Sequence, residues 1–307
     1  MPFRSTGRLT GDLYVLGVNH YPIYLLDGQC PVLLDGGASC AGRIYEEDAR
    51  AILGERAPEM IFVTHSHWDH CGAVYYLKKA FPRMKVAASR GVMEVLQRPG
   101  ALRVIDQLGR EVRHNRYLFP DIYQSRLLDG SFHPFEAEII VEDGQVFDLG
   151  DDSRVEVFAS PGHTRDGHSY YLPREKALIA GDSAGNFDIN LDYMICEFLA
   201  DYKAYLNTIK RLSLLSVEIL CQGHQVIHVG KEEVRAFFDA TKSEAIRFKD
   251  QVLKLLDEEG GSIENVIQRF KAEHYDPLPQ PKQPLNAYIM NLTARVKHLA
   301  EIRDTLR

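Results

Sequence analysis

The stretch IFVTHSHWDHCG, residues 61–72, places a dense group of possible metal ligands directly behind a short apolar run. Three of the chain's twelve histidines and one aspartate fall within six residues, at His65, His67, Asp69 and His70. On an extended segment alternate side chains point to one side, so we expect His65, His67 and Asp69 to converge while His70 turns toward a neighbouring position. Two adjacent metal ions would use that arrangement. A lone histidine is more often structural than a ligand, but four such groups together favour a metal site.

Three more predicted strands end in a candidate ligand. The apolar run VEVFASPG precedes His163, ALIAG precedes Asp182, and VEILCQG precedes His224. A glycine stands immediately before each of the three, and glycine permits backbone angles or a close approach that a Cβ would prevent. We therefore expect these three side chains to join the histidine-rich stretch at one centre.

With these motifs, the chain resembles the metallo-β-lactamase superfamily over residues 10–230, and residues 65–70 match its H-x-H-x-D-H signature. The resemblance implies an α+β fold, an αββα sandwich of two sheets with the site along one edge. It also implies two divalent metal ions. One ion would be held by His65, His67 and His163, the other by Asp69, His70 and His224, with Asp182 bridging them.

Two further residues are expected to orient the ligands without binding metal. Asp35, in LLDGG, matches the early aspartate motif of the superfamily, and His168 follows in PGHTRDGHS. Ligands that bind metal through nitrogen and oxygen usually need such support from their neighbours. Because the set has no thiolate, it suits zinc or iron, and also manganese.

The chemistry that the resemblance implies is hydrolysis, with a metal-bridging hydroxide as the nucleophile. No serine or cysteine nucleophile is then required. Asp69 would also orient the hydroxide or pass its proton to the leaving group. Tyr193 is a second catalytic candidate, because its hydroxyl could reach the substrate carbonyl, although a packing role is at least as well supported by the sequence.

Beyond His228 the pattern becomes entirely helical. Three amphipathic stretches follow, separated by Gly260-Gly261 and by the proline-rich DPLPQPKQP. We interpret residues 1–228 as the catalytic domain, with a helical insertion at about 92–125, and residues 229–307 as a helical lid covering the site. Many strands of the first part follow one another directly, which predicts antiparallel sheets with helices outside. Five apolar residues of the lid could line a pocket or simply fasten the helices: Phe237, Phe238, Tyr288, Ile289 and Leu292.

The insertion and the helical tail also resemble a thioesterase-like branch of the superfamily linked to bacterial quinolone signalling. ALRVIDQLGRE and GDSAGNFD carry this likeness, whereas Asn186 stands where that branch has an acidic residue, which leaves the acyl group open. We expect a hydrolase of a thioester, ester or lactone. Two alternatives remain: a regulatory protein that has retained the metal site, and a mononuclear iron sulfur dioxygenase.

Charge and composition limit the classes of molecule that this protein is expected to bind. A net charge of −7 without a Lys/Arg-rich run disfavours nucleic acid, and no stretch approaches the roughly 20 apolar residues of a membrane span. With no apolar leader and five scattered cysteines, the sequence predicts a cytoplasmic, reduced protein acting on a small-molecule acyl substrate. A homodimer is left open. The other histidines are expected on the surface or in loops: His20, His114, His133, His228, His274 and His298.

Overall fold

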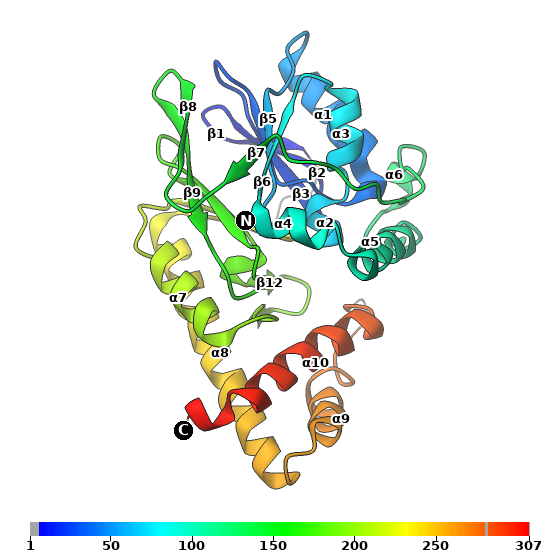
Figure 1. Cartoon of the computed structure of the whole chain (residues 1–307), viewed down its shortest axis with the longest axis vertical. Helices are drawn as coiled ribbons and strands as arrows, with labels where there is room; N and C mark the ends of the chain where they lie inside the picture. Colours follow the sequence, from blue (N-terminus) through cyan, green and yellow to red (C-terminus); the bar gives the residue numbers. More distant parts are fainter. Residues whose placement is uncertain (1–5, 280–281, 307) are drawn as a thin grey trace.

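Two large β-sheets form the body of the protein (Figure 1). The computed structural model describes residues 6–279 and 282–306, and the strands below are those of this part of the chain. The first sheet runs in chain order through β1 (Gly7–Thr10), β2 (Leu13–Val18), β3 (Tyr21–Leu26), β4 (Val32–Leu34), β5 (Met60–Phe62), β6 (Lys85–Ser89) and β7 (Ile139–Val141). The second has the order β15 (Ile227–Val229), β14 (Ile219–Gln222), β11 (Ala177–Gly181), β10 (His168–Leu172), β9 (Ser153–Ala159) and β8 (Val146–Gly150).

Strand direction changes within both sheets. β1 to β4 pair antiparallel, but β4, β5, β6 and β7 pair parallel, as do β11 and β14. The expectation of antiparallel sheets is therefore wrong for these strands. Parallel neighbours need a long crossover, and helices supply it: α1 (Gly42–Leu53) before β5, α2 (Trp68–Cys71) and α3 (Val74–Ala80) before β6, and α7 (Tyr202–Leu212) before β14.

Apolar side chains are buried on both faces of each sheet. In β3, Ile23 and Leu25 pack against the outer helices, while Tyr24 and Leu26 face the other sheet. Such strands are apolar throughout because alternate side chains enter two different cores. α1 and α3 cover the first sheet, and α7 with α8 (Lys231–Glu258) covers the second, which confirms the α+β sandwich of four layers.

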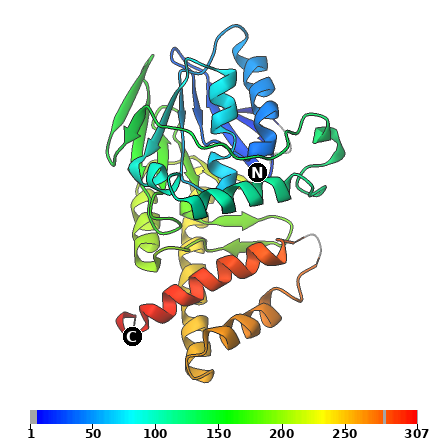
Figure 2. The ribbon, with the colours of Figure 1, turned by 45° about the vertical axis from the view of Figure 1, so that its right-hand side comes forward.

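Helices also form in the two regions where the sequence predicts them. Between β6 and β7 lie α4 (Arg90–Val95), α5 (Pro99–Val112) and α6 (Asp121–Gln124). After β15, α8 extends away from the sheets, and α9 (Ile263–His274) and α10 (Leu285–Glu301) pack against its far half (Figure 2). α9 begins after Ser262, whose hydroxyl accepts a hydrogen bond from the Asn265 N–H and so caps the helix.

A hairpin of β12 (Asn186–Asp188) and β13 (Tyr193–Ile195) lies between the sheets and α10 (Figure 2). Phe237, Phe238 and Leu292 are buried in the core that joins α8, α9 and α10 to the second sheet, so they fasten the helices. Tyr288 and Ile289 are only partly buried there. No helix within the described residues is long and apolar enough to cross a membrane.

Candidate metal centre

Seven side chains from the ends of both sheets form two adjacent groups at one edge of the sandwich. Loops and short helices that follow β5, β9, β11 and β14 carry them. Within each group the possible ligand atoms lie within 4.8 Å of one another. The first group is His65, His67, His163 and Asp182, and the second is Asp69, His70 and His224.

Asp69 lies in the second group, although alternation along a strand would place it with His65 and His67. The backbone is extended at His67, with φ −70° and ψ 151°, but the helical turn of α2 begins at Trp68. In a helix, successive side chains are about 100° apart, so Asp69 and His70 project to a different side from the two preceding ligands. The expectation that Asp69 converges with His65 and His67 is therefore wrong, while the grouping implied by the superfamily resemblance matches the geometry.

The carboxylate of Asp182 lies between the two groups. One oxygen, Oδ2, is 3.3 Å from Nε2 of His163 and 3.6 Å from Nε2 of His70. The other, Oδ1, is 3.5 Å from Nε2 of His224, which is itself 3.6 Å from a carboxylate oxygen of Asp69. Oδ2 thus approaches one imidazole of each group, and a carboxylate placed between two groups of ligands is suited to bridge two cations.

Four of the five imidazoles are held by hydrogen bonds at Nδ1. This leaves Nε2 directed into the centre, the usual arrangement for a metal-binding histidine. In the part of the chain described, Nε2 of His65 and Nε2 of His70 are buried and have no hydrogen-bond partner. Buried polar atoms are normally satisfied, so these two nitrogens fit a metal ion. The partners at Nδ1 are the Thr64 hydroxyl for His65 (3.0 Å), Asp35 Oδ2 for His70 (2.5 Å), and the carbonyls of Glu197 for His163 (2.6 Å) and His20 for His224 (2.6 Å).

The charges at the centre also suit cations. Burial, reinforced by the adjacent His70 ring, holds the pKa of His65 well below its usual range, and burial with His163 lowers the pKa of His67 to about 3. Both rings are therefore neutral and ready to act as ligands. Burial by itself would raise the pKa of Asp182, but the surrounding imidazoles outweigh it and keep this carboxyl ionised.

All three glycines before the ligands meet the demands expected of them: Gly162 has φ +133°, and an added Cβ there would collide with the backbone of Tyr205. Gly181 has φ +53°, which a side chain rarely adopts. Gly223 approaches the centre so closely that an added Cβ would collide with Asp182 Oδ1 and lie 3.1 Å from a ring carbon of His70. Strand β14 can deliver His224 to the site only because this position has no side chain.

Asp35 and His168 occupy different surroundings. The Asp35 carboxylate binds the His70 ring and also accepts a hydrogen bond from the Thr64 hydroxyl at 3.0 Å, so it can orient a ligand. His168 instead has its Nδ1 3.0 Å from the carbonyl of Asp166, and its described contacts include none of the seven ligand side chains. Both residues hold the ligand loop: Asp166 Oδ2 accepts the Ser66 N–H at 2.9 Å, and the backbone N–H of His168 donates to the Thr64 carbonyl at 2.8 Å.

Tyr193 is engaged with helix α8. Its hydroxyl lies 3.0 Å from Glu244 Oε1 and accepts from Arg247 at 3.4 Å. Its described contacts do not include the seven candidate ligands. The structure therefore brings Asp69 into the centre but places the Tyr193 hydroxyl in a polar cluster on α8.

Sequence reasoning missed the residues that act through their backbone. His20 lies in the turn between β2 and β3, as expected of a loop residue, but it is only 7% exposed, and its ring packs against Tyr117 at 5.1 Å. Its carbonyl binds the His224 ring. His228, also 7% exposed, lies 3.0 Å from Gln222 and outside both groups. A carbonyl carries no residue-specific signal, so no pattern in the sequence points to this role of His20.

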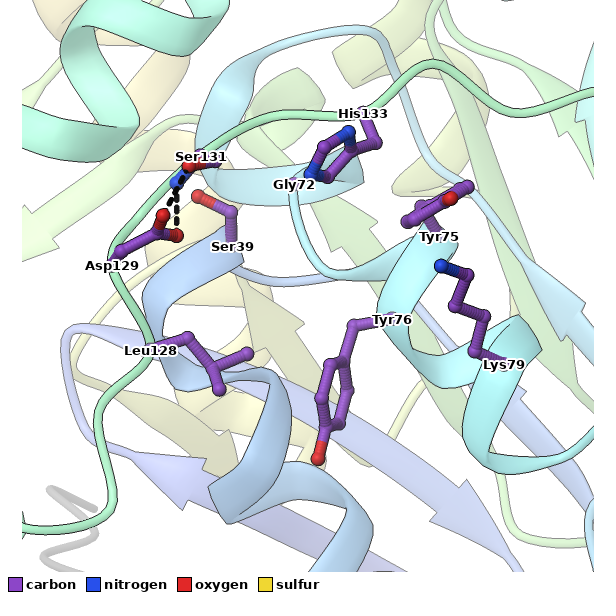
Figure 3. Close-up of a pocket in the computed structure, with 9 residues that line it drawn as sticks. All are labelled: Ser39, Gly72, Tyr75, Tyr76, Lys79, Leu128, Asp129, Ser131 and His133. Carbon is purple, nitrogen blue, oxygen red and sulfur yellow. Dashed lines mark hydrogen bonds between the residues drawn. The ribbon is translucent and has the colours of Figure 1, made fainter.

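A separate cavity of about 320 Å³ lies beside α3 (Figure 3). The Tyr75 and His133 rings pack at 4.8 Å on one side of it, and Asp129 accepts hydrogen bonds from Ser131 on another. None of the seven ligand residues lines it. The cavity is therefore distinct from the metal centre.

The sequence profile of the metallo-beta-lactamase superfamily matches residues 16–224, a span that contains all seven candidate ligands. This chain belongs to that superfamily. Its relatives include the atrochrysone carboxyl ACP thioesterase of Aspergillus fumigatus, 23% identical over 228 residues that cover 73% of this chain and 56% of the relative. Glyoxylase B2 of Dictyostelium discoideum is 26% identical over 147 residues, 46% of this chain and 42% of the relative. The chain thus spans about half the length of these curated relatives.

Solved structures share the fold of this chain at low sequence identity. A metallo-beta-lactamase family protein from Thermus thermophilus superposes with a TM-score of 0.66 at 19% identity, covering 97% of this chain and 95% of the other. A sec-alkylsulfatase from Pseudomonas gives 0.65 at 16% identity, covering 97% of this chain but 50% of the other. At these identities the likeness shows a common fold.

Proposed function

We propose that this protein is a dinuclear metal-dependent hydrolase that cleaves a thioester, with esters and lactones as the related substrate classes. The observation that carries the proposal is the Asp182 carboxylate, which lies between the two groups and approaches imidazoles of both. Two divalent ions held there would supply a Lewis acid for the carbonyl and a water acidified toward neutral pH. Zinc, iron and manganese all suit the donor set.

The chain's own residues would fix the ligands and handle the proton. Asp182 holds the two ligand groups together, and Asp35 keeps the His70 ring directed inward. Asp69 is only partly buried and lies 3.6 Å from His224, so its carboxylate can accept a proton from the attacking water and return it to the leaving group. The role needs a carboxylate at that place, because an amide cannot carry the proton.

The names of two relatives and the apolar side chains beside Asp182 support a thioester as the substrate. Curated relatives include a protein named as an ACP thioesterase and one named hydroxyacylglutathione hydrolase, 29% identical over 126 residues. Apolar side chains that are only partly buried follow the bridging aspartate in β12 and β13, at Phe187 and Met194. An acyl chain placed against them would lie next to Asp182, because Asn186, the first residue of β12, donates to Asp182 Oδ1 at 2.9 Å.

Metal content is the first test. Protein purified without added metal, then reconstituted anaerobically with zinc, iron or manganese, should contain two ions per chain by elemental analysis. Asp182→Ala should lose ions from both positions, because it removes the shared ligand. A wild-type content of one ion or fewer after every reconstitution would contradict the dinuclear centre.

Hydrolysis is the second test. Metal-loaded wild type should hydrolyse members of a panel of acyl-CoA thioesters, aryl esters and lactones, while Asp69→Asn at the same metal content should be slower by about 100-fold or more, the range typical of a lost acid-base group. Asp151→Asn, at an exposed turn between β8 and β9, is the matched control and should behave as wild type. Equal rates for wild type and Asp69→Asn, with oxygen consumed in the presence of a thiol, would favour the dioxygenase instead.

A further inference from the structure

A buried arginine on α10 reaches the segment that holds a metal ligand. Arg295 is 7% exposed, and its guanidinium lies 4.6 Å from the ring centre of Phe248 on α8. Its Nη1 donates a hydrogen bond of 2.9 Å to the carbonyl of Cys196, which is fully buried after β13. The C-terminal helix therefore contacts residues that are 99 positions earlier in the sequence.

The peptide bond between Cys196 and Glu197 is held at both of its polar atoms. Arg295 binds the carbonyl, and the N–H of Glu197 donates to the hydroxyl of Tyr205 at 3.1 Å. Tyr205 is fully buried in α7, so neither partner can move without disturbing a packed helix. Because a peptide unit is planar, fixing both atoms fixes its orientation.

The next carbonyl along the chain orients a ligand. The Glu197 carbonyl accepts the Nδ1–H of His163 at 2.6 Å. Nε2 of the same ring then lies 3.3 Å from Asp182 Oδ2 and 3.0 Å from Nδ1 of His67. The direction of His163 in the centre thus depends on a carbonyl whose own place is set by Arg295 and Tyr205.

Helix fastening alone does not account for an arginine at this position. α10 already buries Leu292, Val296 and Leu299 completely against its neighbours. Burying a guanidinium costs desolvation that an apolar side chain of similar size would avoid. A hydrogen bond from a charged donor is stronger and more directional than a neutral one, which suits a side chain that must hold a carbonyl in place.

We propose that Arg295 is a positioning residue of the metal centre, acting through the Cys196–Glu197 peptide to direct His163 at the first ligand group. The helical extension after residue 228 is then part of the metal site's support. The inference rests on the proposed metal centre. It predicts that α10 affects metal binding at the group that contains His163 and not at the group of Asp69, His70 and His224.

The test compares metal affinities of the two groups in the full-length protein. Zinc would be titrated in competition with a chelator of known affinity, and the cobalt-substituted protein would report ligand geometry through its visible absorption. Arg295→Met keeps the bulk over Phe248 and removes the donor, and we expect about 10-fold weaker binding at the first group, the lower end of the 10- to 100-fold range for outer support. Affinity at the group of Asp69, His70 and His224 should stay within twofold of wild type.

Two further variants separate positioning from stability. Arg295→Lys retains a charged donor and should recover most of the affinity. Tyr205→Phe removes the other hydrogen bond that fixes the peptide and should weaken metal binding at the same ligand group. If Arg295→Met does not fold, this variant alone tests the proposal. Leu299→Ala, which removes an apolar side chain of α10 and leaves the hydrogen bonds of Arg295 and Tyr205 in place, is the matched control and should leave both affinities unchanged.

The outcomes distinguish this inference from the proposed function. Wild-type affinities retained in both Arg295→Met and Tyr205→Phe would overturn the positioning role while leaving a metal hydrolase in place. Equal weakening of both ligand groups, or the same weakening in Leu299→Ala, would show a general effect of stability and would also overturn it. A wild-type protein that binds no metal would overturn both proposals.

Discussion

His70 shows at the scale of single residues how one neighbour directs a ligand. Its Nδ1 lies against Asp35, so its Nε2 faces Asp182. Asp35 also accepts from the Thr64 hydroxyl and from the N–H of Gly36 at 3.1 Å, so its two oxygens serve three donors. Its φ of +72° is a conformation that aspartate and asparagine tolerate better than most residues.

Asp35→Asn should weaken metal binding by about 10- to 100-fold, as expected for an outer partner of a ligand. Asparagine accepts the backbone conformation, but its amide nitrogen cannot accept a hydrogen bond, so one of the three donors loses its partner. Chelator competition at constant pH measures the change. Loss of all metal, as expected for Asp182→Ala, would instead make Asp35 a ligand.

Gly223→Ala should lower metal content while leaving the fold intact. The added Cβ would displace the Asp182 carboxylate, which lies against it, whereas the rest of β14 would keep its pairing. Gly28→Ala is the control, because a Cβ there meets nothing within 4 Å. Elemental analysis and circular dichroism would test this, and an alanine variant with two ions per chain would contradict it.

At the scale of elements, α8, α9 and α10 share a core with the second sheet. Phe270 of α9 packs on Phe248 of α8 with ring centres 4.9 Å apart, and it is 2% exposed. Tyr202 of α7 donates its N–H to the ring of His298 on α10 at 2.9 Å, so α10 is also joined to the sandwich. These contacts make the helical region continuous with the body of the protein.

Phe270→Ala should reduce the free energy of unfolding by about 3 to 5 kcal/mol, the range for removing a buried aromatic ring. Urea unfolding followed by tryptophan fluorescence and circular dichroism would measure it. Met290→Ala, at a residue 49% exposed on α10, should change stability by about 0.5 kcal/mol or less. A similar small effect for Phe270→Ala would mean that α9 contributes little to the fold.

A chain ending at residue 228 should aggregate. It would uncover the apolar side chains of the second sheet and α7 that α8 now buries, among them Leu220 and Leu212. Light scattering and size-exclusion chromatography would detect the aggregates. A monomeric product with a cooperative melting transition would show instead that residues 1–228 fold without the helices.

At the scale of the whole molecule, the metal centre connects the two sheets. His65, His67, Asp69 and His70 follow a strand of the first sheet, whereas His163, Asp182 and His224 follow strands of the second. An ion shared by such ligands binds the folded chain more tightly than the unfolded one, so occupancy is linked to stability.

Removal of metal by a chelator should therefore lower the free energy of unfolding. For free metal at 100 times its dissociation constant the expected loss is about 2.7 kcal/mol for each ion. Thermal unfolding with and without chelator would show it as a lower melting temperature. Asp182→Ala should melt at one temperature under both conditions, and a wild type that is insensitive to the chelator would contradict the link.

The sequence by itself determined most of the ligand set and the helical tail. The six residues from His65 to His70 are neighbours in the chain, so their spacing already limits where they can lie. Helix ends after residue 228 follow from local signals such as the Ser262 cap and the glycines after α8, which act within a few residues.

Tertiary structure decided how those ligands are aimed and which strands run parallel. His163 depends on a carbonyl 34 positions away and His224 on one 204 positions away, and every residue has a carbonyl, so no pattern distinguishes Glu197 or His20. In the sequence, Arg295 is indistinguishable from other polar residues of an amphipathic helix. Its hydrogen bond to the Cys196 carbonyl exists only because α10 packs beside β13. The division between Asp69 and His67 arises because α2 begins at Trp68, where the loop after β5 turns away from the sheet.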